Sequence, residues 1–262
     1  MQNFIYHNPT KLVFGKGMIA RLSQLIPAGK RIMVTFGGGS ARRNGVYDQV
    51  ARALEGREYV EFWGIEPNPT VETLREAIAL GREHRVDFLL SVGGGSVIDG
   101  TKLIAAGLRY EGDPWEIVLR GRADDTVPLG TVLTMAATGS EMHSGAVISR
   151  SETREKYAFQ GSYPVFSVLD PQTTFSLPQR QIAAGLSDTF VHVMEQYLTT
   201  TCQSRLMDRW AEGILHTVVE IAPLIREERR DYDAMADYML AATLALNDMI
   251  RMGVSQGWAT HM

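Results

Sequence analysis

Residues 87–102 constrain this chain more than any other part of its sequence. An apolar run at 88–92 is typical of a short buried strand, and Gly93, Gly94, Gly95 and Ser96 follow it. A helical pattern then runs over 97–108. Glycine lets the backbone approach a phosphate closely, and the free N–H groups of a first helical turn point at it, so this order predicts an anion site. A tight turn that only joins two packed elements is the alternative, because one glycine-rich turn is weak evidence of binding.

The same pattern occurs once more, earlier in the chain. Residues 31–36 have the character of a buried strand, and Gly37, Gly38, Gly39 and Ser40 follow directly. Two such turns in one half of the chain favour a long ligand with phosphates at more than one place, such as a dinucleotide. The segments between the two turns differ, so no tandem repeat is indicated.

Composition narrows the classes of function. The chain has 262 residues, 45% of them hydrophobic and 21% charged, which is typical of one large globular domain or two ordinary ones. The net charge of -4 provides no polycation for nucleic acid or for an anionic membrane. Cys202 is the only cysteine, which excludes an internal disulfide and suits a reducing compartment. Residues 1–10 contain no recognisable signal peptide, and no apolar run is long enough to span a bilayer, so we expect a cytoplasmic protein.

The order of predicted elements indicates two parts. Strands are expected within 4–14, as an edge strand or hairpin, and at 31–36, 59–63, 88–92, 128–134, 146–149 and 165–169. Helices at 17–25, 46–54 and 70–84 alternate with them, and this alternation indicates a mostly parallel sheet with helices on both faces. Beyond Pro178 we expect helices at 179–197, 204–226 and 232–252, with Pro223 kinking or ending the second. The sequence therefore predicts an α/β, Rossmann-like domain over 1–178, followed by an all-α domain over 179–262.

Asp188 and His192 form the second informative pattern. They are four residues apart, so on a helix they share a face about one turn apart, a spacing that suits a carboxylate and an imidazole on one metal ion. Glu195 falls near the same face and could orient a metal ligand through a hydrogen bond. Two other interpretations stay open: Ser187 or Asp188 caps the helix, or His192 is a satisfied core histidine.

Polar residues near the glycine turns also have two interpretations each. Thr138 and Ser140 could place hydroxyls beside a ligand at the carboxyl end of a strand, or Thr138 and Glu141 could form a capping box. Asp99 and Lys102 lie in the first helical turns after the second glycine turn. Lys102 could meet a phosphate, or it could be an ordinary solvated lysine.

The remaining candidates carry weaker signals. Arg42 and Arg43 suit an extra phosphate but could equally be surface charges. Asn68 could simply shape a loop, and Lys156 lies in a charged run where a solvated lysine is expected. The roles of His143 and His261 stay undecided.

Several motifs then combine along the chain. They are Phe-Gly-Lys-Gly at 14–17, Gly-Gly-Gly-Ser at 37–40, Gly-Ile-Glu-Pro-Asn-Pro at 64–69, the stretch 93–102, Ala-Thr-Gly-Ser-Glu at 137–141, Gly-Ala-Val-Ile-Ser at 145–149, and a signature from 169–171 through Pro178 and Gly185 to Asp188 and Glu195. Together they cover essentially the whole chain. The combination resembles the iron-containing (group III) alcohol dehydrogenases, and within them the bacterial NADPH-dependent aldehyde reductase and butanol dehydrogenase branch.

The resemblance implies where NADP(H) would bind. Residues 93–96, with Asp99 and Lys102 nearby, would hold the pyrophosphate and the flanking ribose, and Thr138 and Ser140 would line the cleft. Residues 37–40 would surround the adenosine ribose. The full candidate cofactor-binding set is Gly37, Gly38, Gly39, Ser40, Asn68, Gly93, Gly94, Gly95, Ser96, Asp99, Lys102, Thr138, Ser140 and Lys156.

The glycine turn at 37–40 also bears on cofactor choice. NAD-preferring relatives carry an acidic residue near the position of Gly39, where it accepts hydrogen bonds from the ribose hydroxyls. Gly39 and Ser40 carry no such charge, so a 2′-phosphate fits without repulsion, and the resemblance implies NADP(H).

The resemblance further implies a catalytic divalent metal, iron or zinc, with Asp188 and His192 as its first two ligands and catalytic residues. Family members take two more histidine ligands from helices beyond the part that resembles residues 258–262, and His261 is expected just before the third ligand. The chain is therefore expected to lack much of the family's helical domain. We expect a partner or a homodimer mate to cover its remaining apolar helix faces.

The function implied is metal-assisted, NADPH-dependent reduction of aldehydes to primary alcohols. The alternative is a truncated, catalytically inactive homologue that binds NADP(H). A lyase of the dehydroquinate synthase type would share the architecture, but it would need a denser set of basic residues for an acidic substrate.

Overall fold

The computed structural model describes residues 1–199, 204–228 and 230–261, so Cys202 lies outside the described residues. Six strands form one sheet in the order β1-β8-β5-β4-β2-β3, and every neighbouring pair in it is parallel. The strands are β1 (Lys11–Phe14), β2 (Ile32–Phe36), β3 (Tyr59–Phe62), β4 (Phe88–Gly94), β5 (Leu129–Met135) and β8 (Phe166–Leu169). This sheet confirms the predicted α/β, Rossmann-like architecture.

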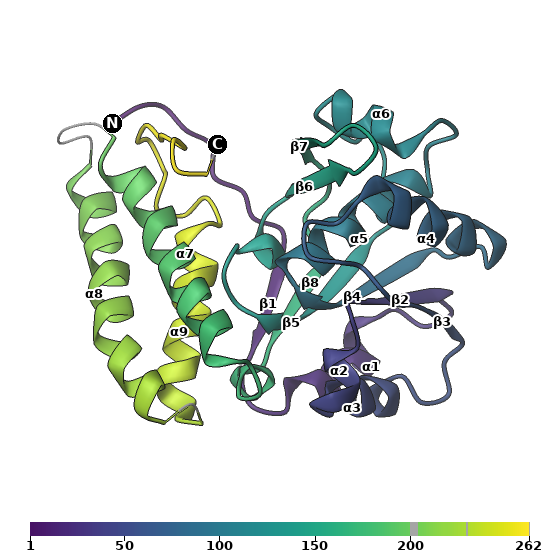
Figure 1. The fold of residues 1–262 in the computed structure, drawn as a ribbon, viewed down its shortest axis with the longest axis horizontal. Coiled ribbons are helices and arrows are strands. Elements are labelled where there is room, and N and C mark those ends of the chain that lie inside the picture. The colour runs from purple at the N-terminus through teal and green to yellow at the C-terminus, as the bar shows by residue number, and fades with distance from the viewer. Residues whose placement is uncertain (200–203, 229, 262) are drawn as a thin grey trace.

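Helices cover both faces of the sheet (Figure 1). One face carries α4 (Val71–Glu83), α5 (Gly95–Gly107) and α6 (Pro114–Leu119). The other carries η1 (Met18–Arg21), α1 (Leu22–Leu25), α2 (Ser40–Arg43) and α3 (Val46–Ala53). β4 lies inside the sheet between β2 and β5, so its side chains are buried on both faces, which explains its nearly unbroken apolar sequence.

The strand predicted at 146–149 exists but is not part of the parallel sheet. It is β6 (Gly145–Arg150), which pairs antiparallel with β7 (Glu155–Gln160) as a separate hairpin. The hairpin packs on the outer side of α5, with Ile148 and Phe159 in the same apolar core as α4 and α5. The charged run around Lys156 concealed β7, because one face of that strand is exposed.

The chain after residue 178 is helical throughout its described part, as predicted. It forms α7 (Gln179–Tyr197), α8 (Arg205–Glu227) and α9 (Tyr232–Ala245), which lie beside the sheet domain in Figure 1. Pro223 does not end the second helix, because α8 continues through it to Glu227. The alternative, a kink at Pro223, stays a prediction. The helix predicted over 232–252 ends early, at Ala245, and residues 246–261 follow as turns and irregular backbone. The domain boundary at 178 stays a prediction.

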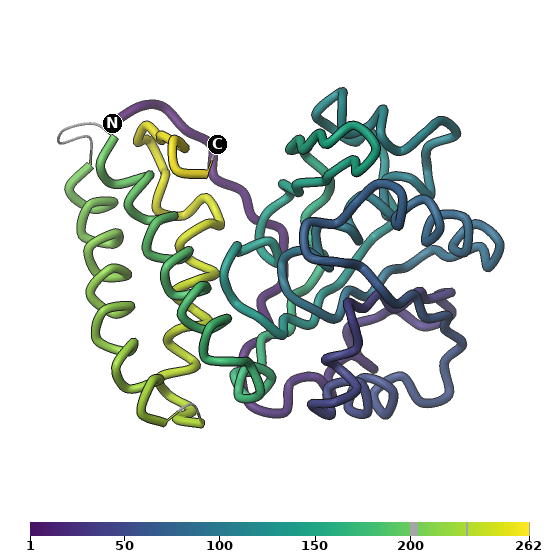
Figure 2. Tube along the Cα trace, viewed as in Figure 1, coloured from purple at the N-terminus to yellow at the C-terminus, as the bar shows by residue number. Residues whose placement is uncertain are grey.

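The amino-terminal segment runs beside the last part of the described chain. Figure 2 shows the first residues passing the helical part before they enter the sheet as β1. The Gln2 backbone N–H donates to the Gly253 carbonyl at 2.8 Å, so the amino-terminal segment ties the helical part to the sheet. None of the described helices is both long and apolar enough to cross a membrane.

Close contact between α7 and the sheet fixes the helical part in place. Gly185 of α7 lies where a Cβ atom would overlap the Tyr238 hydroxyl and would lie 2.6 Å from the Ala136 carbonyl oxygen. That hydroxyl, on α9, donates to the same carbonyl just beyond β5. Only a residue without a side chain permits this approach.

We therefore predict that Gly185→Ala destabilises the protein by about 2 kcal/mol or more, because an added methyl overpacks a junction that includes backbone. Gly213→Ala in α8 is the matched control, since a Cβ there meets nothing within 4 Å. It should stabilise by about 0.5 kcal/mol through its better helix propensity. Urea unfolding followed by circular dichroism measures both values. Equal effects of the two substitutions would contradict the close packing at Gly185.

Candidate active site

A cleft of about 820 Å³ opens between the carboxyl ends of the parallel strands and the helical part. In α/β sheets this edge is where ligands bind. Polar residues of both parts line it: Asn68, Ser96, Asp99, Thr138, Ser140, His143, Lys156, Tyr163, Asp188, His192, Asp248, Arg251 and His261. A volume of this size is typical of a ligand site.

The second glycine turn forms one wall of this cleft. β4 ends at Gly94, and α5 begins at Gly95 with no side-chain cap on its first N–H groups. A Cβ atom at Gly95 would overlap the Thr138 hydroxyl, and one at Gly93 would lie 2.5 Å from a Val97 methyl. The turn thus presents backbone amides to the cleft at the amino end of a helix, which favours an anionic group.

A buried polar cluster supports this wall. Lys102 is fully buried, and its ammonium donates to the Ser140 carbonyl at 2.8 Å, the Ser140 hydroxyl at 2.9 Å and the Gly145 carbonyl at 2.7 Å. Asp99 accepts from the Ser140 hydroxyl at 2.5 Å and from the Val147 N–H at 2.9 Å. α5 is thereby tied to the loop after β5 and to β6. The ammonium of Lys102 points at protein acceptors, so its contact with a phosphate stays a prediction.

Burial sets the pKa values in this cluster. It lowers the pKa of Lys102 to about 8, although the carboxylates of Asp99 and Glu141 act in the opposite direction. It also raises the pKa of Asp99 and of Glu141. Glu141 accepts from Thr243 of α9 at 2.6 Å and does not reach back to Thr138, so the capping-box alternative is wrong.

Two predicted cofactor residues face each other across the hairpin side of the cleft. Lys156 of β7 donates to the Asn68 side-chain oxygen at 2.9 Å, and the Asn68 N–H donates to the Ser96 hydroxyl at 3.4 Å. Asn68 adopts a positive φ of 55°, which places its side chain on this rim. The three residues join the loop after β3, the hairpin and the start of α5.

The first glycine turn lies apart from this cleft. Gly37, Gly38, Gly39 and Ser40 follow β2, and none of the four lines the 820 Å³ space. The Arg42 guanidinium lies 4.1 Å from the centre of the Trp63 ring and 3.5 Å from a Glu61 carboxylate oxygen. Glu61 thus partly neutralises the charge of Arg42, which with Arg43 was a candidate to bind an additional phosphate group.

The opposite wall of the cleft carries three potential metal ligands. Asp188, His192 and His261 each offer one ligand atom, and these atoms lie within 4.8 Å of one another. The rings of His192 and His261 are stacked, with centres 4.3 Å apart. Asp188 oxygens lie 3.7 Å from His192 Nδ1 and 3.3 Å from His261 Nε2.

The donor set fits a divalent cation. His192 Nδ1 is buried and has no hydrogen-bond partner, which is a costly state that a bound cation relieves. One carboxylate and two imidazoles are ligands that both zinc and iron accept. Burial lowers the pKa of His192, which keeps that ring in the neutral form a metal ligand requires.

Sequence reasoning missed several residues of the cleft. His261 is expected just before a metal ligand, but its ring lies within the cluster formed with Asp188 and His192, so which residue is the third ligand stays a prediction. His261 belongs to the irregular segment 246–261, and no periodic pattern of apolar residues in the sequence indicates the path of that segment. Tyr163, Asp248 and Arg251 form a polar group on the rim, where Tyr163 donates to Asp248 at 3.2 Å and Arg251 pairs with it at 2.8 Å.

Comparison with known proteins agrees with this geometry. The family described as iron-containing alcohol dehydrogenase matches residues 9–171, and the carboxyl-terminal part of the same family matches 182–262. The NADPH-dependent aldehyde reductase YqhD of Escherichia coli is 52% identical over all of this chain, which spans 69% of that relative. A probable NADH-dependent butanol dehydrogenase of Bacillus subtilis is 47% identical over all of this chain, and the match covers 69% of that relative's length.

Solved structures are similar along the whole described fold. The crystal structure of E. coli YqhD superimposes with a TM-score of 0.97 over 99% of this chain and 68% of that one, at 52% identity. NADH-dependent butanol dehydrogenase A of Thermotoga maritima gives a TM-score of 0.95 over 100% of this chain and 67% of that one, at 39% identity.

The buried lysine offers a test of the cleft wall. Lys102→Met should lower the free energy of unfolding by about 3 kcal/mol, because it leaves Asp99 and Glu141 buried without a cation. Lys16→Met, at an exposed lysine, should change it by less than about 0.5 kcal/mol. Urea unfolding at pH 7 measures both. A loss below about 1 kcal/mol for Lys102→Met would show that the ammonium does not hold this wall together.

His143 offers a test with pH. Burial lowers its pKa to about 3, and nearby Lys102 acts in the same direction. As pH falls below about 6.5, the unfolded chain takes up a proton that the folded protein does not, so stability is lost. Between pH 7 and pH 5 the wild type should lose about 2 kcal/mol more than His143→Gln, with both proteins held in chelator. Parallel pH profiles for the two proteins would contradict the buried, neutral ring.

Proposed function

The chain belongs to the iron-containing alcohol dehydrogenase family, and we propose that it reduces aldehydes to primary alcohols with NADPH. The observation that carries this proposal is one cleft with two different walls. Backbone amides of the second glycine turn line one wall, and a carboxylate with two imidazoles lines the other. A nicotinamide carrier and a carbonyl substrate need such opposed sites for direct hydride transfer.

The pyrophosphate of the cofactor is proposed to lie on Gly94, Gly95 and Ser96, with Thr138 and Ser140 beside the nicotinamide half. The uncapped amino end of α5 supports this placement. Asn68 and Lys156 would contact the ribose or phosphate from the hairpin side. The turn at 37–40 would hold the adenosine end, outside the 820 Å³ space.

NADP(H) is proposed over NAD(H). Gly39 and Ser40 carry no acidic side chain that would repel a 2′-phosphate. Arg43 lies beside the turn, with a guanidinium nitrogen 3.7 Å from where a Gly39 Cβ would be. The relative from E. coli is an NADPH-dependent enzyme, whereas the one from B. subtilis is described as NADH-dependent.

A divalent ion, iron or zinc, is proposed to be held by Asp188, His192 and His261. When bound, such an ion supplies Lewis-acid polarisation of the aldehyde oxygen. The proposed role of the protein's own residues is to bring the reactants together, with the glycine turn holding the cofactor opposite the three ligand residues. With its pKa near 3, His143 carries no extra proton at neutral pH, which favours water as the proton source for the alkoxide.

Two further proposals concern the setting of the enzyme. A homodimer is proposed through β1, an edge strand whose neighbourhood exposes Phe4, Ile5 and Leu12. Light scattering of the purified chain tests it. A cytoplasmic location is proposed from the single cysteine.

Loss of one metal ligand tests the proposed function. Asp188→Asn and His192→Ala should each lower kcat for butanal reduction by about 100-fold or more, because stabilisation of charge on the aldehyde oxygen is lost. The Kd for NADPH should stay within about twofold, because the glycine turn is untouched.

Activity and metal content are read on the same samples. A variant with normal turnover would reject the metal assignment. A wild type that binds NADPH but does not oxidise it with butanal would be a binding protein and not a reductase.

A further inference from the structure

The irregular segment after α9 carries His261 to the cleft, and the last turns of α7 hold it there. The Gly257 N–H donates to the Glu195 carbonyl at 3.0 Å. Thr199 donates its hydroxyl to the Ser255 carbonyl at 2.6 Å, and the Gln256 amide donates to the Gln196 side-chain oxygen at 3.2 Å. Three consecutive residues of the segment thus bond to the end of α7 and to the residues directly after it.

The Glu195 side chain extends this set of contacts to the histidine itself. Its carboxylate accepts from the Thr260 backbone N–H and meets His261 Nδ1 in a very short contact. The Glu195 side chain is 8% exposed and that of His261 is 30% exposed, so the contact lies at the edge of the cleft. The other ring nitrogen of His261, Nε2, faces Asp188 at 3.3 Å.

Three of the four acidic and imidazole groups in this set come from α7, and helix geometry explains why they share one face. Asp188, His192 and Glu195 follow at spacings of four and three, so they line one face of α7. Asp188 and His192 offer ligand atoms to the cluster, and Glu195 lies about one turn further on. The Glu195 carboxylate contacts His261 at Nδ1, whereas the other ring nitrogen, Nε2, faces Asp188.

We propose that Glu195 is a positioning residue that fixes the proton of His261 on Nδ1 and turns Nε2 towards Asp188 and His192. The proposal rests on the metal site proposed above. A carboxylate on the far nitrogen of a histidine ligand holds the ring's orientation and tautomer and makes the ligating nitrogen more basic.

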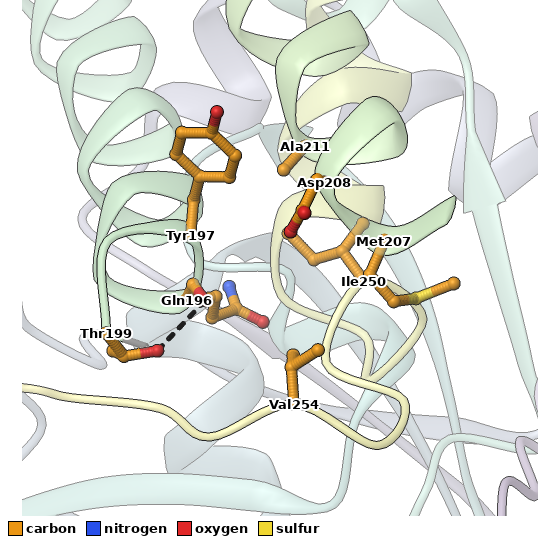
Figure 3. A pocket seen from close by; sticks show the side chains of 8 residues that line it. All are labelled: Gln196, Tyr197, Thr199, Met207, Asp208, Ala211, Ile250 and Val254. Carbon is orange, nitrogen blue, oxygen red and sulfur yellow. Dashed lines mark hydrogen bonds between the residues drawn. The ribbon is translucent and has the colours of Figure 1, made fainter. Parts of the chain in front are cut away.

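Other contacts anchor the same segment independently of this carboxylate. Figure 3 shows a small space lined by Gln196 and Tyr197 of α7, by Thr199 just beyond that helix, and by Ile250 and Val254 of the segment. Residues of α8 complete its lining. That space measures about 10 Å³, which is close to the smallest volume that holds one water, so this junction is packed and is no ligand site. Neutralising Glu195 should therefore leave the segment in place.

The test compares Glu195→Gln, Glu195→Ala and the matched control Glu212→Gln in the full chain. Glu212 of α8 accepts from Tyr197 at 2.9 Å and lies outside the cluster. Each protein is stripped of metal and titrated with Zn²⁺ against a competing chelator dye. Glu195→Ala should weaken Zn²⁺ binding by about 10- to 100-fold, Glu195→Gln by a smaller factor of at least about threefold, and Glu212→Gln not at all.

A second readout separates positioning from mere anchoring. The melting temperature of metal-free Glu195→Gln should match that of the metal-free wild type, and only the rise on adding Zn²⁺ should shrink. The proposal would be overturned if the melting temperature of metal-free Glu195→Gln fell by as much as the variant and the wild type differ with Zn²⁺ bound. Zn²⁺ affinities within twofold of wild type for both Glu195 variants would overturn it as well. Should Glu195→Ala fail to fold, the isosteric glutamine variant decides alone. A wild type that binds no Zn²⁺ would instead overturn the metal site itself.

Discussion

The contact between α7 and the carboxyl end of β5 determines where every group in the cleft lies. Gly185 lets α7 approach the Ala136 carbonyl so closely that the Tyr238 hydroxyl completes the junction. Asp188 and His192 follow within the next two turns of the same helix, so this one approach sets how far they lie from the glycine turn. Because packed interiors do not deform continuously, a shift here would move one whole wall of the cleft relative to the other.

The facing wall depends on a different kind of interaction. Lys102 and Glu141 are charged groups removed from water, and Asp99 lies beside them at the cleft. Each of the three is held by hydrogen bonds to neighbouring elements. Such a cluster adds little stability in itself, since desolvation offsets most of the attraction between the charges. Its effect is to fix the loop after β5 and the hairpin against α5. The amides of the glycine turn are then presented by a rigid frame, which a binding site for a phosphate requires.

The sequence was sufficient for the parts of the fold that local patterns encode. Buried parallel strands, glycine turns and amphipathic helices have short-range signals, and β4 with α5 was located to within a few residues. The hairpin was misassigned because β6 looks like any strand and β7 is half exposed and charged. The position of His261 cannot be predicted from the sequence for a related reason: tertiary bonds to Glu195 and Gln196 set the path of its segment, and no periodic pattern indicates those bonds. Lys102 looked like a surface lysine because nothing in its neighbourhood reveals three acceptors brought from distant parts of the chain.

The central claim is that a nicotinamide carrier and a metal ion occupy opposite walls of one cleft. Nuclear relaxation measures this directly, with Co²⁺ added to the metal-stripped protein and NADP⁺ bound. The account predicts strong paramagnetic broadening of the nicotinamide protons and much weaker broadening of the adenine protons. Equal broadening of both rings, or none at saturating Co²⁺ and NADP⁺, would contradict it.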